Sequence, residues 1–206
     1  WTCAAGTLDI GITGDNYLWM TTFQEHAEQA AAFFMQREPY ASNAHRIRFF
    51  IVPTQRDLYC TRSSTINRLI TCNGTVARAV FTEAGYTPDW VFILVDKMEY
   101  GGSGGVTCVS YAGSLRNKVG AHECLGHAAG QRDEYQLYST AGPNVDAWTG
   151  QIWKGVTAPP LPGKWVKGCY RPNYWCERVQ KPDGTYVKSL MAALGYPEFS
   201  HRSRQL

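Results

Sequence analysis

Short apolar runs recur along the first half of the chain and predict a set of β-strands. Leu8–Ile12 is apolar and is followed by the turn signal Gly14-Asp15-Asn16. Arg46–Val52 alternates at first and then becomes wholly apolar, as in a partly buried strand. Trp90–Val95 is apolar throughout and rich in β-branched and aromatic residues, so it is predicted to be a central strand. Val106–Tyr111 is a further strand candidate.

Between these runs, other segments repeat their apolar residues at helical spacing. Tyr17–Arg37 is predicted to be a helix that Pro39 ends, and Thr75–Ala84 a shorter helix closed by a glycine. Asn117–Gly130 is a third helix candidate, also ended by glycine. The apolar residues that share one face of the first helix are Trp19, Phe23, Ala27, Ala30 and Phe34.

The remaining segments carry weaker structural signals. Residues 54–75 are polar and predict a loop with one helical turn, and the Gly-rich stretch Tyr100–Gly105 predicts a hairpin or a close approach of another backbone. Residues 139–187 hold most of the prolines, so little regular structure is expected there. We expect one α/β domain over residues 1–206, with an N-terminal lobe of about 1–135 and a loop-rich C-terminal lobe of about 136–206.

Charge and hydropathy exclude two classes of partner. The formal net charge is only +3, and no dense Lys/Arg block is present, so a nucleic-acid surface is not expected. No apolar run approaches the ~18 residues that a membrane span requires. The sequence leaves the oligomeric state open.

The cysteines indicate the cellular compartment of the protein. Seven cysteines favour an oxidising compartment, and therefore a secreted, periplasmic or extracellular protein, although reduced core cysteines remain the alternative. Cys60 and Cys72 are close enough in sequence to close a short loop, as are Cys169 and Cys176. Cys3 with Cys108 is the remaining candidate pair, which leaves Cys124 as a small buried helix residue.

The stretch His122-Glu123-Cys124-Leu125-Gly126-His127 resembles the zinc signature His-Glu-x-x-His with one extra residue. Histidines four apart lie ~40° apart around a helix, but histidines five apart lie ~140° apart and cannot share one metal ion. A one-residue π-bulge would restore the pairing, and Gly126 lies inside the interval that must deform. We therefore predict a bulged helix.

The residues after His127 favour a metal site. They read His-x-x-Gly-x-x-Asp, in which Gly130 lets the helix end and Asp133 can supply the third ligand. Glu134 is a competing oxygen donor, and His201 is a more distant candidate. Without these residues, the two histidines would be read as ordinary side chains of a helix.

This stretch resembles the metzincin signature with one insertion. It is more similar to the IgA-peptidase-like zinc metallopeptidases, whose metal helix runs into a Gly-rich stretch and then Asp-Glu-Tyr, as in Asp133-Glu134-Tyr135. The likeness covers roughly residues 8–135 and includes Gly14-Asp15-Asn16-Tyr17, Glu38-Pro39-Tyr40 and the Gly-rich stretch. Ser189-Leu190-Met191 is similar to a metzincin Met-turn, which implies that Met191 lies under the metal.

The departure from that family lies in the spacing of the histidines. In an ungapped comparison, the second ligand position holds Gly126 and His127 comes one place later. The dipeptidyl-peptidase III enzymes carry His-Glu-x-x-Gly-His and bind zinc through both histidines, and this chain resembles them in that motif alone. Their example implies that the spacing is compatible with zinc.

The resemblance implies a secreted zinc metalloendopeptidase with a zincin-like twisted mixed sheet, long helices and a loop-rich C-terminal lobe. His122, His127 and Asp133 would hold zinc, and Glu123 would take a proton from the attacking water. Protein or peptide would be the substrate, with contacts expected at the sites Tyr135, Gly102, Gly104 and Tyr196. The alternative is a catalytically inactive metzincin-like module that binds protein or glycan through a tryptophan-rich segment.

Overall fold

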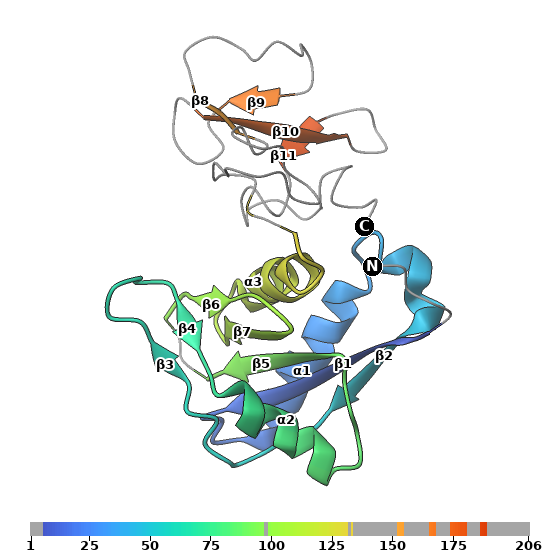
Figure 1. The fold of residues 1–206 in the computed structure, drawn as a ribbon, viewed down its shortest axis with the longest axis vertical. Helices are drawn as coiled ribbons and strands as arrows, with labels where there is room; N and C mark the ends of the chain where they lie inside the picture. Colours follow the sequence, from blue (N-terminus) through green and yellow to red (C-terminus); the bar gives the residue numbers. More distant parts are fainter. Residues whose placement is uncertain are drawn as a thin grey trace. The chain divides into compact units, whose positions relative to one another are not determined.

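The computed structural model describes residues 6–96, 99–131 and 133, together with the backbone of four strands between residues 152 and 188. The chain divides into two compact units, and each is described by itself (Figure 1). The first comprises Trp1–Gln36 and Tyr40–Ala129, and the second comprises Arg37–Pro39 and Gly130–Leu206.

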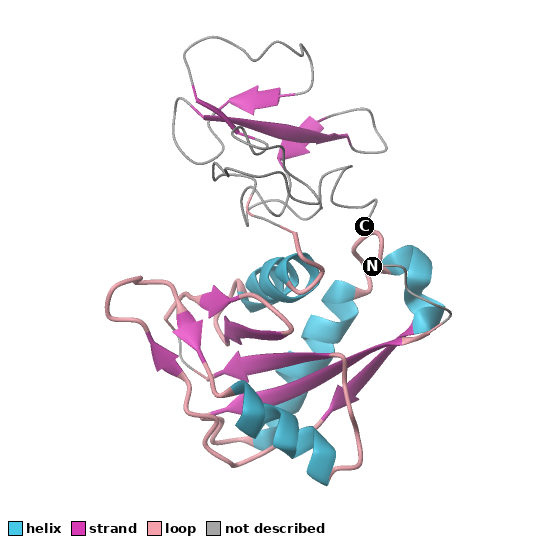
Figure 2. Ribbon diagram, in the orientation of Figure 1, coloured by secondary structure: helices cyan, strands magenta, loops and turns pink. Residues whose placement is uncertain are grey.

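A five-stranded sheet forms the centre of the first unit (Figure 2). Its order is β2-β1-β5-β7-β6, and all pairings are parallel except that of β6 with β7. The predicted α/β class with a mixed sheet is therefore confirmed. The strands are β1 (Leu8–Asp15), β2 (Ile47–Ile51), β5 (Trp90–Val95), β6 (Gly102–Ser103) and β7 (Thr107–Tyr111).

The strand β5 is the middle strand, as its apolar sequence predicts, and all six of its residues are buried. The neighbouring β1 continues to Asp15, whereas the sequence predicts a turn from Gly14 onward. Asp15 is 1% exposed, and its carboxylate accepts a hydrogen bond from the Leu58 amide at 2.8 Å. Pairing with Val95 and this buried hydrogen bond extend the strand beyond the end of its apolar run.

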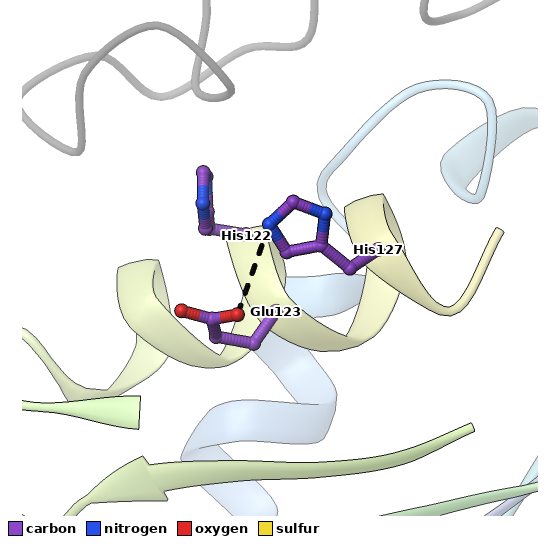
Figure 3. A group of neighbouring side chains, drawn as sticks. All are labelled: His122, Glu123 and His127. Carbon is purple, nitrogen blue, oxygen red and sulfur yellow. Dashed lines mark ion pairs between the residues drawn. The ribbon is translucent and has the colours of Figure 1, made fainter. Parts of the chain in front are cut away.

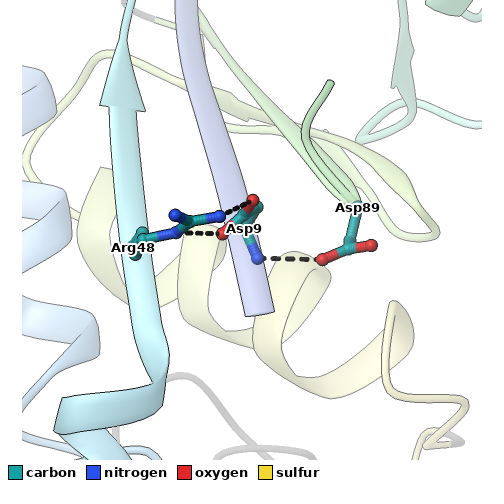
Figure 4. Close-up of polar contacts among 3 residues, drawn as sticks. All are labelled: Asp9, Arg48 and Asp89. Atoms are coloured by element: carbon teal, nitrogen blue, oxygen red, sulfur yellow. Dashed lines mark hydrogen bonds and ion pairs between the residues drawn. The ribbon is translucent and has the colours of Figure 1, made fainter. Parts of the chain in front are cut away.

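Charged residues join the starting ends of three strands (Figure 4). Asp9 on β1 lies directly opposite Arg48 on β2, and the two side chains form a two-pronged ion pair at 2.6 and 2.7 Å. Asp89, just before β5, accepts the Asp9 amide at 2.9 Å, while its own amide donates to the Asp9 carbonyl at 2.8 Å. The pairs favour one register at this edge, because a one-residue slip would break all of them.

Helix α1 (Met20–Phe34) covers one face of the sheet, and its apolar stripe is the predicted one except at its start. Phe23, Ala27, Ala30 and Phe34 are fully buried, whereas Trp19 is 72% exposed. Trp19 is the extended residue that precedes the helix, so its side chain does not follow the helical period and the prediction for it is wrong.

Helix α2 (Gly74–Glu83) packs on the opposite face, where the Phe81 ring fills the space above Gly11. Asn73 begins the helix by accepting the amides of Thr75 and Val76, each at 3.1 Å. The preceding loop contains a short antiparallel pair, β3 (Thr61–Arg62) and β4 (Ile70–Thr71). A single helical turn is expected in this loop, and the structure has this hairpin instead.

The third predicted helix has two parts. Helix α3 (Arg116–Gly120) is a short α-helix that continues directly into a π-helix, η2 (Ala121–His127). Gly120 lies so close to the sheet that a β-carbon there would be 2.7 Å from the Phe92 ring and 3.2 Å from the Phe34 ring. The metal motif therefore rests on the sheet face that α1 also covers.

Two disulfides join described cysteines of the first unit. The predicted Cys60–Cys72 bridge is confirmed, and it closes the β3–β4 hairpin. The prediction for Cys108 and Cys124 is wrong, because they pair with each other and join β7 to the π-helix. The sequence left Cys3 as the candidate partner of Cys108 and gave Cys124 none, but the β7–α3 connection returns the helix across the sheet and brings Cys108 and Cys124 together. The disulfides indicate an oxidising, extracellular environment.

Strands occur in the second unit, where the sequence predicts little regular structure. Strand β10 (Tyr174–Gln180) pairs antiparallel with β8 (Ile152–Lys154), β9 (Trp165–Lys167) and β11 (Tyr186–Lys188). The frequent prolines obscured these short strands; β9 and β11 are the sequence neighbours of β10, and β8 pairs with it across β9 in sequence. The predicted Cys169–Cys176 bridge and Met191 lie outside the residues whose side chains are described. Among the described residues, no helix combines the length and apolar character needed to cross a membrane.

Replacing Gly120 tests how closely the metal helix must approach the sheet. Gly120→Ala should lower the free energy of unfolding by ~1–3 kcal/mol, because the new methyl group overlaps the Phe92 ring. Urea unfolding measures the change. Lys118→Ala, on the same helix but outside the core, should change stability little. Equal stability of Gly120→Ala and the wild type would contradict the close packing.

Candidate metal centre

The π-helix brings His122 and His127 to the same side of the metal motif. Hydrogen bonds in a π-helix run from residue i to residue i+5, so residues five apart lie one turn above each other. The two imidazole ring centroids are 4.9 Å apart and the rings are nearly perpendicular, at 85°. The predicted bulge therefore exists, as a seven-residue π-helical segment, and it resolves the mismatch in spacing.

Glu123 completes a group of three side chains (Figure 3). One of its carboxylate oxygens lies 3.9 Å from Nε2 of His127, and each of the three residues offers a donor atom within 4.8 Å of the others. His122 is buried at 6% exposure, whereas the side chains of His127 and Glu123 keep 23% and 17% exposure. His122 is therefore shielded from solvent, whereas His127 and Glu123 are partly accessible to it.

This donor set could hold a metal ion. Two imidazole nitrogens and a carboxylate oxygen suit first-row divalent ions. Donor atoms at ~2.0–2.2 Å from one ion lie at most ~4.4 Å apart, so small side-chain rotations from the present spacing would bring all three into one coordination shell. All three residues come from a single helical segment, so the local backbone positions the whole group.

The Gly-rich stretch borders this group, as the resemblance implies. A β-carbon on Gly104 would lie 2.4 Å from Cβ of His127 and 2.5 Å from its ring, so only glycine fits there. A β-carbon on Gly102 would lie 3.3 Å from the Glu123 side chain. The Gly102 amide already donates to the Arg68 carbonyl at 3.0 Å, so this point on the edge strand is paired within the chain.

Tyr100 lies near Glu123 and is hydrogen-bonded to Arg68, and sequence reasoning did not identify either as a site residue. Burial raises the pKa of the Tyr100 phenol; the charge and hydrogen bond of Arg68 counteract this, and the Glu123 carboxylate adds a smaller upward shift. The Tyr100 phenol is thus within electrostatic reach of Glu123 and is hydrogen-bonded to Arg68. Tyr100 begins the Gly-rich stretch, and this position could have marked it as a site residue. Arg68 lies on the loop that the Cys60–Cys72 disulfide closes, and no sequence motif marks it.

The other predicted site residues belong to the second unit. Asp133 is described, but its placement relative to His122 and His127 is not defined, so its role as third ligand stays a prediction. Glu134, Tyr135, Tyr196 and His201 lie outside the described residues.

Gly104 offers a direct test of the packing against His127. Gly104→Ala should displace the imidazole and weaken metal binding by ~10-fold or more, because outer contacts that orient a ligand commonly contribute this much. Isothermal titration with zinc measures the affinity. Val106→Ala, at an exposed position of the same turn, should leave it unchanged. Unaltered affinity in Gly104→Ala would mean that His127 does not need its present position.

No protein-family model matches this chain, and no curated protein matches it. The likeness to IgA-peptidase-like enzymes therefore stays a resemblance of motifs. Function is inferred from the side chains of the metal centre and their surroundings.

Proposed function

We propose that this protein is a secreted zinc-dependent metalloendopeptidase with a zincin-like fold. The observation that supports this most strongly is the convergence of His122, His127 and Glu123 on one π-helical segment. An ordinary helix would separate histidines five apart, so the π-helical segment is what lets both serve one ion. Two histidines with a neighbouring glutamate are the donor and base set of zinc peptidases. The cysteine pairs support an exported protein.

Zinc, when bound, would polarise the scissile carbonyl and favour ionisation of water. The chain's own contribution is to hold the reacting groups and to move a proton. His122 and His127 bind the ion as neutral imidazoles, with Asp133 proposed as the third ligand and Glu134 as the competing donor. Glu123 accepts a proton from the attacking water at its carboxylate oxygen and then donates it to the departing amine nitrogen.

The surroundings of Glu123 suit that role. Its side chain keeps 17% exposure and lies beside the edge strand β6. A substrate backbone could approach this edge next to Gly104, whereas the Gly102 amide is already paired with Arg68. Tyr135 and Tyr196 are proposed as oxyanion contacts, and Met191 as the residue under the zinc, on the resemblance alone.

A second function is favoured by the position of the Glu123 carboxylate. It is near enough to both histidines to be a metal ligand itself. A glutamate that binds the ion cannot also carry the proton, and the protein would then be a catalytically inactive module that binds protein or glycan. The two functions differ in what removal of Glu123 does to the metal.

Metal content tests the ligands. The wild type should bind about one zinc ion per chain, while His122→Ala and His127→Ala should bind almost none at micromolar zinc, because each loses a principal donor. Mass spectrometry of dialysed protein gives the stoichiometry. His45→Ala, which removes an exposed histidine of the 3-10 helix Ala41–Arg46, is the matched control and should keep the ion. A wild type that binds no zinc would exclude the enzyme.

Glu123→Ala separates the two functions. As a base, Glu123 can be removed with zinc retained and peptide hydrolysis lowered by ~10²–10⁴-fold. A peptide library analysed by mass spectrometry provides the hydrolysis readout, with Glu28→Ala on the exposed face of α1 as the control variant. Loss of zinc together with an absence of hydrolysis in the wild type would identify Glu123 as a ligand and favour the binding module.

A further inference from the structure

The π-helical segment needs support from outside itself. A π-helix is rare and in most proteins lasts a single turn, whereas this segment runs for seven residues. If it reverted to an α-helix, the residues beyond the change would rotate by ~100° per displaced residue, and His127 would leave the side that His122 occupies. The contacts that prevent this rotation therefore bear directly on the metal centre.

We infer that the Cys108–Cys124 disulfide and the Tyr40 hydroxyl are positioning groups of the metal centre: they fix the π-helix in the register that lets His122 and His127 share one ion. The inference rests on the proposed metal site. It assigns to the disulfide a function beyond general stabilisation, since neither cysteine is a ligand.

The disulfide acts from the middle of the segment. Cys124 lies between the two histidines, and its side chain, like that of Cys108, is fully buried. Cys108 belongs to β7, where it pairs with Phe92 of the central strand. The bridge holds the two Cα atoms 5.3 Å apart, so the helix can neither turn nor slide along the sheet without moving a buried strand.

Tyr40 acts one residue further along. Its hydroxyl donates to the Leu125 carbonyl at 2.6 Å, and both residues are buried. The Tyr40 ring packs edge-on against Trp90 of β5, with ring centroids 6.5 Å apart. A buried carbonyl needs a donor, so this hydrogen bond favours the backbone orientation that the π-helix gives Leu125.

The two anchors attach to different parts of the sheet. Cys124 is tied to β7, and Leu125 is tied through Tyr40 to the start of β5. Cys124 is held by its side chain and Leu125 by its carbonyl, at different positions around the helix axis, so one rotation cannot preserve both contacts. Together they select one rotational position for the segment that carries Glu123 and the histidines.

The chain offers a matched control for each anchor. Cys60–Cys72 also lies in the first unit, but it closes the β3–β4 hairpin and bonds no residue of the π-helix. Tyr17 is a second buried tyrosine, and its hydroxyl is hydrogen-bonded to Nδ1 of His26 at 2.9 Å rather than to the metal helix. Removing either control group should lower stability without altering metal affinity.

The test compares zinc affinity, measured by competition with a chelator, with the melting temperature of the metal-free protein. Cys108→Ala/Cys124→Ala should lower both, with a loss of ~10–100-fold in zinc affinity. Cys60→Ala/Cys72→Ala should lower the melting temperature alone. Tyr40→Phe keeps the ring and the fold, and should weaken zinc binding by ~10-fold, whereas Tyr17→Phe should not.

The outcomes are separable. If the wild type binds no zinc, the proposed function fails. If it binds zinc and the Cys108/Cys124 variant and Tyr40→Phe bind equally tightly, the metal site stands and the positioning role is overturned. Should circular dichroism show that the double cysteine variant is unfolded, the comparison of Tyr40→Phe with Tyr17→Phe still decides the inference.

Discussion

One extra residue between two histidines is the constraint on which this candidate metal centre depends. In an α-helix it would place His122 and His127 on different sides, and the motif would be two unrelated side chains. The π-helix absorbs the residue, and Gly126 lies within the deformed turn. The two imidazole rings therefore lie together, with their centroids 4.9 Å apart. Without this arrangement, Glu123 would have no pair of histidines with which to form a metal-binding group.

The sheet supplies the support that the π-helix lacks. Gly120 lets the helix approach Phe92 closely, and the Cys108–Cys124 bridge follows within one turn on the same side. Because β5 is buried along its whole length and β7 is paired to it in parallel, the surface beneath the helix is rigid. Burial of the central strands thus contributes to the geometry of the site as well as to the stability of the fold.

Local pattern was enough to predict most elements of the first unit and the need for a bulge at residues 122–127. It failed where distant segments decide the outcome. The pairing of Cys124 with Cys108 depends on how the helix returns over β7, and the contact of Arg68 with Tyr100 depends on the β3–β4 loop, whose Arg68 carbonyl accepts from the Gly102 amide. Trp19 has the right spacing but precedes the helix, and β8–β11 are mostly strands of three residues in a proline-rich segment, too short to give a clear pattern.

The candidate metal centre combines side chains from one short segment with residues from distant parts of the chain. Two imidazoles and the carboxylate come from six consecutive residues, so a single folded segment carries the metal group and the proposed base. Tyr100, with its hydrogen-bond partner Arg68, and the Gly-rich edge come from other segments, and Tyr100 and Gly102 lie near Glu123. The same segment also has contacts from outside itself, because Cys124 is bonded to Cys108 on β7 and the Leu125 carbonyl accepts a hydrogen bond from Tyr40.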